Sequence, residues 1–257
     1  MSQAVAQVLS PDGAPRGTAF AISRDLVLTA FHCIGDRLLG KMSLPRVSLQ
    51  FLGGSRLTAS FHGGNHILNF ALLKLESSLP NPMEPIPMAT EVEPYESFRC
   101  IGYPAAVWGP DYVTIRGEVR NPAGSLLEGV PTIQLYCREA AANLELSGMS
   151  GAPVLVGKDP EVVVGIIRWN PLRPGGTAQA QGRMVFACPI KNVLEEFPAL
   201  EVYADGGDIV ALVKELRPLF GDRLEDRLIH NGAKAHDIVR YLTAKETGDA
   251  IATGLRD

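Results

Sequence analysis

No stretch of this 257-residue chain approaches the roughly 20 consecutive apolar residues that a membrane-spanning helix requires. Residues 1–10 have neither a basic start nor an apolar core, so they do not resemble a secretory signal. Runs of five or more like charges are missing too, and the net charge is −4. Because nucleic-acid binding needs clustered positive charge, we expect no nucleic-acid partner. The lack of a membrane span and of a signal sequence predicts no membrane association and a cytoplasmic protein.

Cysteine is scarce. The four cysteines are 67, 37 and 51 residues apart, at Cys33, Cys100, Cys137 and Cys188. No CxxC pair exists, which excludes a zinc ribbon, and neither metal-ligand spacings nor phosphate-binding loops occur, so we expect no cofactor and no metal. Without an export signal, free thiols in a reducing compartment are expected. A Cys100–Cys137 bridge inside a barrel is the alternative.

Glycine and proline are plentiful, at 26 and 19 residues, while 46% of the chain is hydrophobic and 20% is charged. This composition excludes a disordered chain, a collagen and a small disulfide scaffold. The length is sufficient for a sizeable core. Many turn-forming residues in an apolar chain favour short strands over long helices.

Up to about residue 190 the pattern indicates β structure. Turn signals such as Gly63-Gly64 and Asn121-Pro122 separate about eleven short runs with β-branched or aromatic residues. The runs are 18–23, 26–29, 46–52, 57–61, 70–75, 98–102, 112–120, 132–137, 153–156, 162–169 and 183–190. So many short strands without helical spacing predict a barrel or a sandwich.

The pattern changes after residue 190. Residues 191–196 predict a short helix, and residues 198–207 predict a loop. From Asp208 the apolar spacing is helical, and two more short helices are expected near 224–229 and 238–251. We therefore predict a β domain over 1–205 and a helical C-terminal extension over 206–257. Its apolar stripes pack on the barrel or on a protein partner.

Three segments stand out by their order. Leu-Thr-Ala-Phe-His-Cys ends at Cys33 and contains His32, Asn-Phe-Ala-Leu-Leu begins at Asn69, and Ser-Gly-Met-Ser-Gly-Ala-Pro contains Ser150. The spacings are 37 and 81 residues. A histidine ending a strand or a serine between glycines is, alone, more often structural. Together they resemble the chymotrypsin-like serine proteases, including the HtrA-type branch, whose motifs are L-T-A-x-H-C, D-x-A-L-L and G-x-S-G-x-P.

The resemblance covers about residues 14 to 200 and implies a fold of two six-stranded antiparallel barrels. It implies that Ser150 is the nucleophile, that His32 is its general base, and that the amides of Gly148 and Ser150 form an oxyanion hole. The rival hydrolase motif G-x-S-x-G does not fit, because Gly151 follows the serine directly.

The same resemblance implies the substrate-binding residues. The base of the primary pocket falls at Leu144, or at Glu145 if the register shifts by one. Ile167, Arg168 and Trp169 would form the pocket wall and pair with the substrate backbone. Arg168 either attracts an acidic substrate group or is a solvated edge-strand residue.

The third catalytic position departs from the family pattern, because Asn69 stands where an aspartate is expected. An amide carries no charge, and it can donate to the imidazole and fix the wrong tautomer; the corresponding swap in the serine-protease template costs about 10⁴ in turnover. Three explanations stay open: an engineered inactivation, a natural enzyme of low or conditional activity, and a pseudoprotease that only binds.

Other departures concern activation and disulfides. Met149 replaces an aspartate that pairs with the new N-terminus in many secreted relatives, and no cysteine precedes Cys33 to bridge with it. His62 and His66 are expected to be solvated turn residues. We expect a cytoplasmic serine endopeptidase acting on a protein or peptide substrate, with a catalytically silent binding module as the alternative. Proteases joined to short helical modules occur in bacterial defence, and the tail resembles such adaptors in size and helicity.

Overall fold

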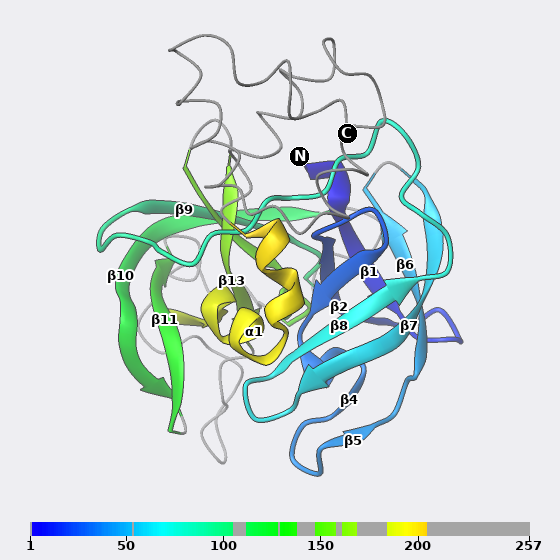
Figure 1. Cartoon of the computed structure of the whole chain (residues 1–257), viewed down its shortest axis with the longest axis horizontal. Helices are drawn as coiled ribbons and strands as arrows, with labels where there is room; N and C mark the ends of the chain where they lie inside the picture. The colour runs from blue at the N-terminus through cyan, green and yellow to red at the C-terminus, as the bar shows by residue number, and fades with distance from the viewer. Residues whose placement is uncertain are drawn as a thin grey trace, which may run out of the picture.

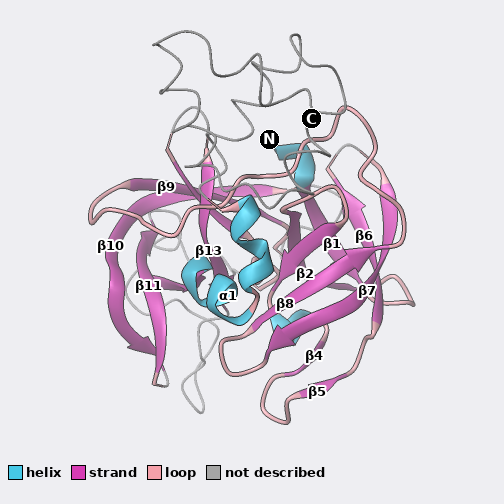
Figure 2. Cartoon of the chain, in the orientation of Figure 1, coloured by secondary structure: helices cyan, strands magenta, loops and turns pink. Residues whose placement is uncertain are grey.

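The protein folds into two closed β-barrels that lie side by side (Figure 1). The computed structural model describes residues 2–52, 54–104, 112–127, 129–137, 147–157, 161–168 and 184–204. Strands dominate these residues, and helices are few and short (Figure 2). The predicted fold, two six-stranded antiparallel barrels in a mostly-β protein, is confirmed.

The first barrel has the strand order β1-β2-β3-β8-β7-β6, with antiparallel neighbours. Its strands are β1 (Val5–Leu9), β2 (Pro15–Ala21), β3 (Leu26–Thr29), β6 (Arg46–Phe51), β7 (Arg56–Asn65) and β8 (Phe70–Leu75). Between β3 and β6 the chain forms a two-stranded sheet of β4 (Gly35–Asp36) and β5 (Lys41–Met42). Two 3-10 helices, η1 (Ser2–Ala4) and η2 (Phe31–Cys33), precede β1 and follow β3.

The second barrel has the strand order β10-β11-β14-β13-β12-β9. Its strands are β9 (Ser97–Gly102), β10 (Val113–Leu127), β11 (Val130–Cys137), β12 (Pro153–Val156), β13 (Val162–Arg168) and β14 (Met184–Pro189). The short helix α1 (Ile190–Glu196) follows and contacts β13 and β14, and the 3-10 helix η5 (Pro198–Tyr203) ends the described chain. The predicted helix over 191–196 is confirmed.

Some local predictions are wrong. Gly63-Gly64 and Asn121-Pro122 lie inside β7 and β10, because each strand has a register irregularity there that absorbs an extra residue instead of turning the chain. Residues 198–203 form a 3-10 helix and not a loop. Strand β1 was not predicted, because four of its five residues are buried and no alternation marks it. The very short β4 and β5 were also missed.

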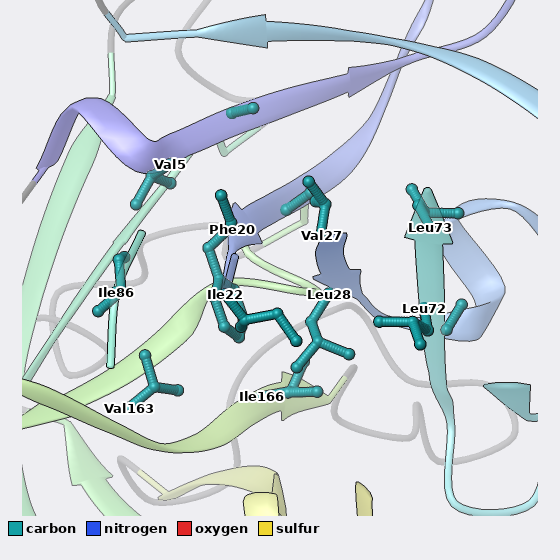
Figure 3. Packing of buried hydrophobic residues seen from close by; sticks show 14 of the residues in the cluster. Val5, Phe20, Ile22, Val27, Leu28, Leu72, Leu73, Ile86, Val163 and Ile166 are labelled. Atoms are coloured by element: carbon teal, nitrogen blue, oxygen red, sulfur yellow. The ribbon is translucent and has the colours of Figure 1, made fainter. Parts of the chain in front are cut away.

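The junction of the barrels is part of the core. Val163 and Ile166 come from β13 of the second barrel but belong to the apolar cluster of the first (Figure 3). Ile166 lies beside Leu28 of β3 in that view. The second barrel has its own cluster, which includes Ile115 and Val154. Shared apolar burial therefore fixes the two barrels against each other.

The predicted C-terminal extension, residues 206–257, lies outside the described residues, and so do its expected helices. Within the part of the chain that is described, no helix has the length and apolar character needed to cross a membrane.

Candidate active site

His32 lies in the helix η2, directly after β3, between the buried residues Phe31 and Cys33. Its main chain and its ring meet the same atom, Oδ1 of Asn69. The His32 backbone N–H donates to this oxygen at 3.2 Å, and the ring Nδ1 lies 3.0 Å from it. The structure thus brings together two of the predicted site residues, 37 positions apart.

Asn69 immediately precedes β8 and is only 1% exposed. Its φ of 61° is left-handed, a conformation in which asparagine and aspartate are the most tolerated residues after glycine. The backbone N–H of His32 can only donate, so it selects the oxygen of the Asn69 amide and not the nitrogen.

That choice fixes the imidazole tautomer. Since Oδ1 of Asn69 faces Nδ1 of His32, this ring nitrogen must carry the proton, and Nε2 is left without one. The wrong tautomer that an asparagine can impose is disfavoured here. Nδ2 of Asn69, however, is buried and without a hydrogen-bond partner. An amide at this position therefore orients the base but leaves one polar group unsatisfied.

The electrostatic environment keeps the imidazole neutral. Burial of the ring lowers the pKa of His32 below its ordinary value of 6.5, and the hydrogen bond with Asn69 opposes this only in part. Three positive charges lower the pKa further, those of Arg37, Arg168 and Arg16. A neutral imidazole is a proton acceptor at neutral pH, and the same surroundings stabilise an imidazolium poorly.

Ser150 sits in a tight turn whose glycines adopt positive φ, 92° at Gly148 and 87° at Gly151. A Cβ on Gly151 would collide with the carbonyl oxygen of Thr18, so glycine is required there. The carbonyl oxygen of Ser150 accepts from the backbone N–H of Thr18 at 2.8 Å, and the Cys33 thiol lies 3.5 Å from it. The turn is therefore docked against the residue that follows His32.

The predicted oxyanion-hole amides are available. In the described part of the chain, the backbone N–H groups of Gly148 and Ser150 donate no hydrogen bond, whereas Gly151 and Ala152 donate to Ile167 and Met149. Two such amides in one turn can together bind a negative charge.

Thr18 was not predicted as a site residue, yet it connects β2 to the nucleophile turn. Its hydroxyl donates to the carbonyl oxygen of Gly148 at 2.8 Å and accepts from the backbone N–H of Tyr103 at 3.0 Å. Its carbonyl oxygen accepts from the Thr29 hydroxyl at 2.6 Å. No sequence signal marks it, because its partner Gly148 is 130 positions away.

The structure describes only two of the predicted substrate-binding residues, Ile167 and Arg168. Leu144, its neighbour Glu145 and Trp169 lie outside the described residues. Ile167 is only 3% exposed; its N–H donates to Ala152 and its carbonyl accepts from Gly151, both at 2.9 Å. The expectation that Ile167 pairs with substrate is wrong, because the chain itself uses these groups.

Arg168 is 1% exposed, so the prediction of a solvated edge-strand arginine is wrong. Its guanidinium Nη2 is 3.5 Å from the carbonyl oxygen of Ile67 in the first barrel. The side chain therefore points into the junction between the barrels.

His66 lies in a turn, as expected, but is half-buried: its Nδ1 is 3.0 Å from the carbonyl oxygen of Arg37, and its ring packs against Phe31. His62 is exposed, as expected, but it lies inside β7 and not in a turn. Met149 is fully buried in the core of the second barrel.

All four cysteines are free and buried, which confirms the expected free thiols and excludes the alternative Cys100–Cys137 bridge. Burial raises the pKa of Cys33 to about 11 and that of Cys188 to about 12, so neither thiol is a nucleophile at neutral pH. Among the described residues, no group of three or more His, Cys, Asp or Glu side chains could hold a metal ion.

The sequence profile of the trypsin-like peptidase domain matches residues 17–166, more than half of the chain. The chain belongs to the trypsin-like peptidase family. This peptidase has the family's two barrels, with His32 on the first and Ser150 on the second. A comparison with curated proteins finds no match.

Solved structures share the fold of this trypsin-like peptidase. The MamO protease domain from Magnetospirillum magneticum (apo form) is 17% identical, with a TM-score of 0.58, covering 76% of this chain and 96% of that one. A serine endoprotease from Yersinia pestis is 18% identical, with a TM-score of 0.56, covering 77% and 63%. The active form of the Rv3671c protease from M. tuberculosis is 17% identical, with a TM-score of 0.55, covering 77% and 80%.

Proposed function

We propose that this trypsin-like peptidase is a serine endopeptidase of low or conditional activity, in which Ser150, His32 and Asn69 act together on protein or peptide substrates. The observation that carries the proposal is the shared Oδ1 of Asn69, which accepts from the backbone of His32 and faces its Nδ1. This arrangement leaves Nε2 as the proton acceptor that a serine nucleophile needs.

In the proposed reaction, Oγ of Ser150 attacks the scissile carbonyl carbon while its proton moves to Nε2 of His32. The amides of Gly148 and Ser150 bind the resulting oxyanion. The imidazolium then protonates the leaving amine, the C–N bond breaks, and a water molecule hydrolyses the acyl-enzyme with His32 again as the base. Asn69 orients the ring throughout but adds no negative charge, so each imidazolium-forming step is slow.

The alternative is a catalytically silent protease-fold binding module. The neutral Asn69 and the lowered pKa of His32 favour it, because both disfavour the imidazolium. For either function we propose a cytoplasmic location, supported by the four buried free thiols.

Labelling with a serine-directed fluorophosphonate separates the two functions. Labelling at Ser150 that disappears in Ser150→Ala and in His32→Ala supports the endopeptidase, because the hydroxyl needs its base. Ser60→Ala on β7 and the exposed His62→Ala are matched controls that should keep it. Labelling that does not depend on His32, or no labelling even of Asn69→Asp protein, would favour the binding module.

A further inference from the structure

Arg168 is the last residue of β13 and is buried at the junction of the two barrels. Successive strand residues point to opposite faces, so Arg168 is on the same face as Ile166. Ile166 packs into the core of the first barrel beside Leu28 (Figure 3). The Arg168 side chain therefore extends from the second barrel toward the first, where its Nη2 reaches the carbonyl oxygen of Ile67 at 3.5 Å.

Ile67 belongs to the tight turn that delivers Asn69. Oδ1 of Asn65 accepts from the backbone N–H groups of Ile67 and Leu68, both at 3.0 Å, and Asn69 then adopts its left-handed conformation. The guanidinium thus contacts this turn two residues before the side chain that orients His32.

The charges around His32 are dominated by arginine. The neutral amide of Asn69 faces the ring, and the ring of His66 packs on the neighbouring Phe31. The positive charges that lower the pKa of His32 are those of Arg37 in the turn between β4 and β5, Arg168 on β13 and Arg16 on β2. On β14, Cys188 faces Arg168, and burial keeps that thiol protonated at neutral pH. Of the three arginines, Arg16 is exposed and Arg37 half-buried, so Arg168 is the one that water does not screen.

We infer that Arg168 is a positioning residue for the His32–Asn69 pair: it clamps the turn before Asn69 onto the second barrel and adds its positive charge to the surroundings of the imidazole. The inference rests on the proposed function, since it assigns a role within the same site. It makes His32 depend on a residue that is 136 positions away in the sequence.

Burial of the ring lowers the pKa of His32 most, and the charge of Arg168 lowers it further. Arg168→Gln removes the charge and keeps a hydrogen-bond donor, whereas Arg168→Lys keeps the charge. The matched control is Arg56→Gln, which removes an exposed arginine of β7. The titration of the His32 ring is followed by NMR, with its signal assigned by its loss in His32→Gln. The fluorophosphonate labelling rate is measured at about pH 6 and about pH 8, on either side of the ordinary imidazole value.

The expected result is an upward shift of the His32 midpoint in Arg168→Gln, with the labelling rate at the lower pH falling relative to the higher one. Arg168→Lys and Arg56→Gln should keep the midpoint near that of the wild type. Faster hydrogen exchange of the His32 amide in Arg168→Gln than in Arg56→Gln would support the clamp. If Arg168→Gln does not fold, Arg168→Met removes the charge without burying a new polar group.

An unchanged midpoint in the folded Gln or Met variant would overturn the inference, and so would an equal shift in Arg168→Lys, because packing and not charge would then be responsible. The NMR titration does not require turnover. A midpoint shift without any labelling therefore counts against the proposed function alone, whereas His32-dependent labelling with no shift counts against Arg168 alone.

Discussion

The side-chain amide of Asn69 contacts both the backbone and the ring of His32. Its backbone conformation suits asparagine and aspartate alike, and its oxygen already makes the contacts that an aspartate carboxylate would make with His32. The difference is confined to the second polar atom, the buried Nδ2 without a partner, and to the missing charge. A carboxylate at this position would replace an unsatisfied donor by an acceptor in a surrounding rich in arginine.

Asn69→Asp should therefore raise peptide turnover, by up to about 10⁴ if the missing charge is the only defect. The gain should be smaller than this limit, because the positive charge of Arg168 would also attract the new carboxylate and weaken its effect on His32. Turnover of a casein or peptide-library substrate measures the effect, and Ser150→Ala in the same background controls for contaminating proteases. If the Asn69→Asp protein cleaves none of these substrates, the site does not operate as a protease.

The nucleophile turn depends on strand β2 as much as on its own residues. Thr18 uses its N–H, its carbonyl and its hydroxyl to join Ser150, Thr29, Gly148 and Tyr103. The turn has positive φ at two glycines, a conformation that glycine adopts readily. This hydroxyl couples the orientation of the turn to the first barrel.

Thr18→Val keeps the side-chain shape and removes the hydroxyl, which leaves the Gly148 carbonyl and the Tyr103 N–H without their partner. We expect a loss of about 1–3 kcal/mol in the free energy of unfolding, together with slower labelling of Ser150. Chemical denaturation and labelling rates measure the two effects. Thr58→Val, at a half-buried position of β7, should change stability by no more than about 0.5 kcal/mol. Equal effects of the two substitutions would show that the Thr18 hydroxyl has no special role.

The two barrels form one functional unit, because their shared core at β13 brings residues of both to the junction. His32 and Asn69 come from the first barrel, whereas Ser150 and Arg168 come from the second. Neither barrel alone contains a complete site. The described chain reaches Ala204, after α1 and η5, whose buried residues join the apolar cluster of the first barrel.

Because His32, Asn69 and Ser150 all precede residue 205, deletion of 221–257 should leave a folded, soluble barrel with intact labelling of Ser150. We propose that the C-terminal extension binds a protein partner, so the same deletion should alter association. Circular dichroism, labelling and size-exclusion chromatography of the full-length and shortened proteins test this. Unfolding or loss of labelling on truncation would make the tail part of the protease core.

The order and spacing of the motifs predicted the two barrels through their resemblance to the chymotrypsin-like serine proteases. The same motifs singled out His32, Asn69 and Ser150 as candidates, and the structure brings the first two into contact. Each motif is a short stretch whose chemistry is visible in its own letters, and most strands show their apolar or β-branched runs. Strand β1, whose residues do not alternate, and the glycine and proline positions absorbed into β7 and β10 were missed, because burial on both faces and bulges override local turn preferences.

Contacts between residues far apart in the sequence were beyond such local patterns. The tautomer of His32 is decided by its contact with the amide oxygen of Asn69, 37 positions away. Thr18 anchors the turn of Ser150 through Gly148, 130 positions away from Thr18 in the sequence. Arg168 contacts Ile67, which is 101 positions away. Periodicity reports which face of a strand is buried, not which distant group it meets there. Only the closure of both barrels and their packing at β13 determine these partners, and with them the charges that surround His32.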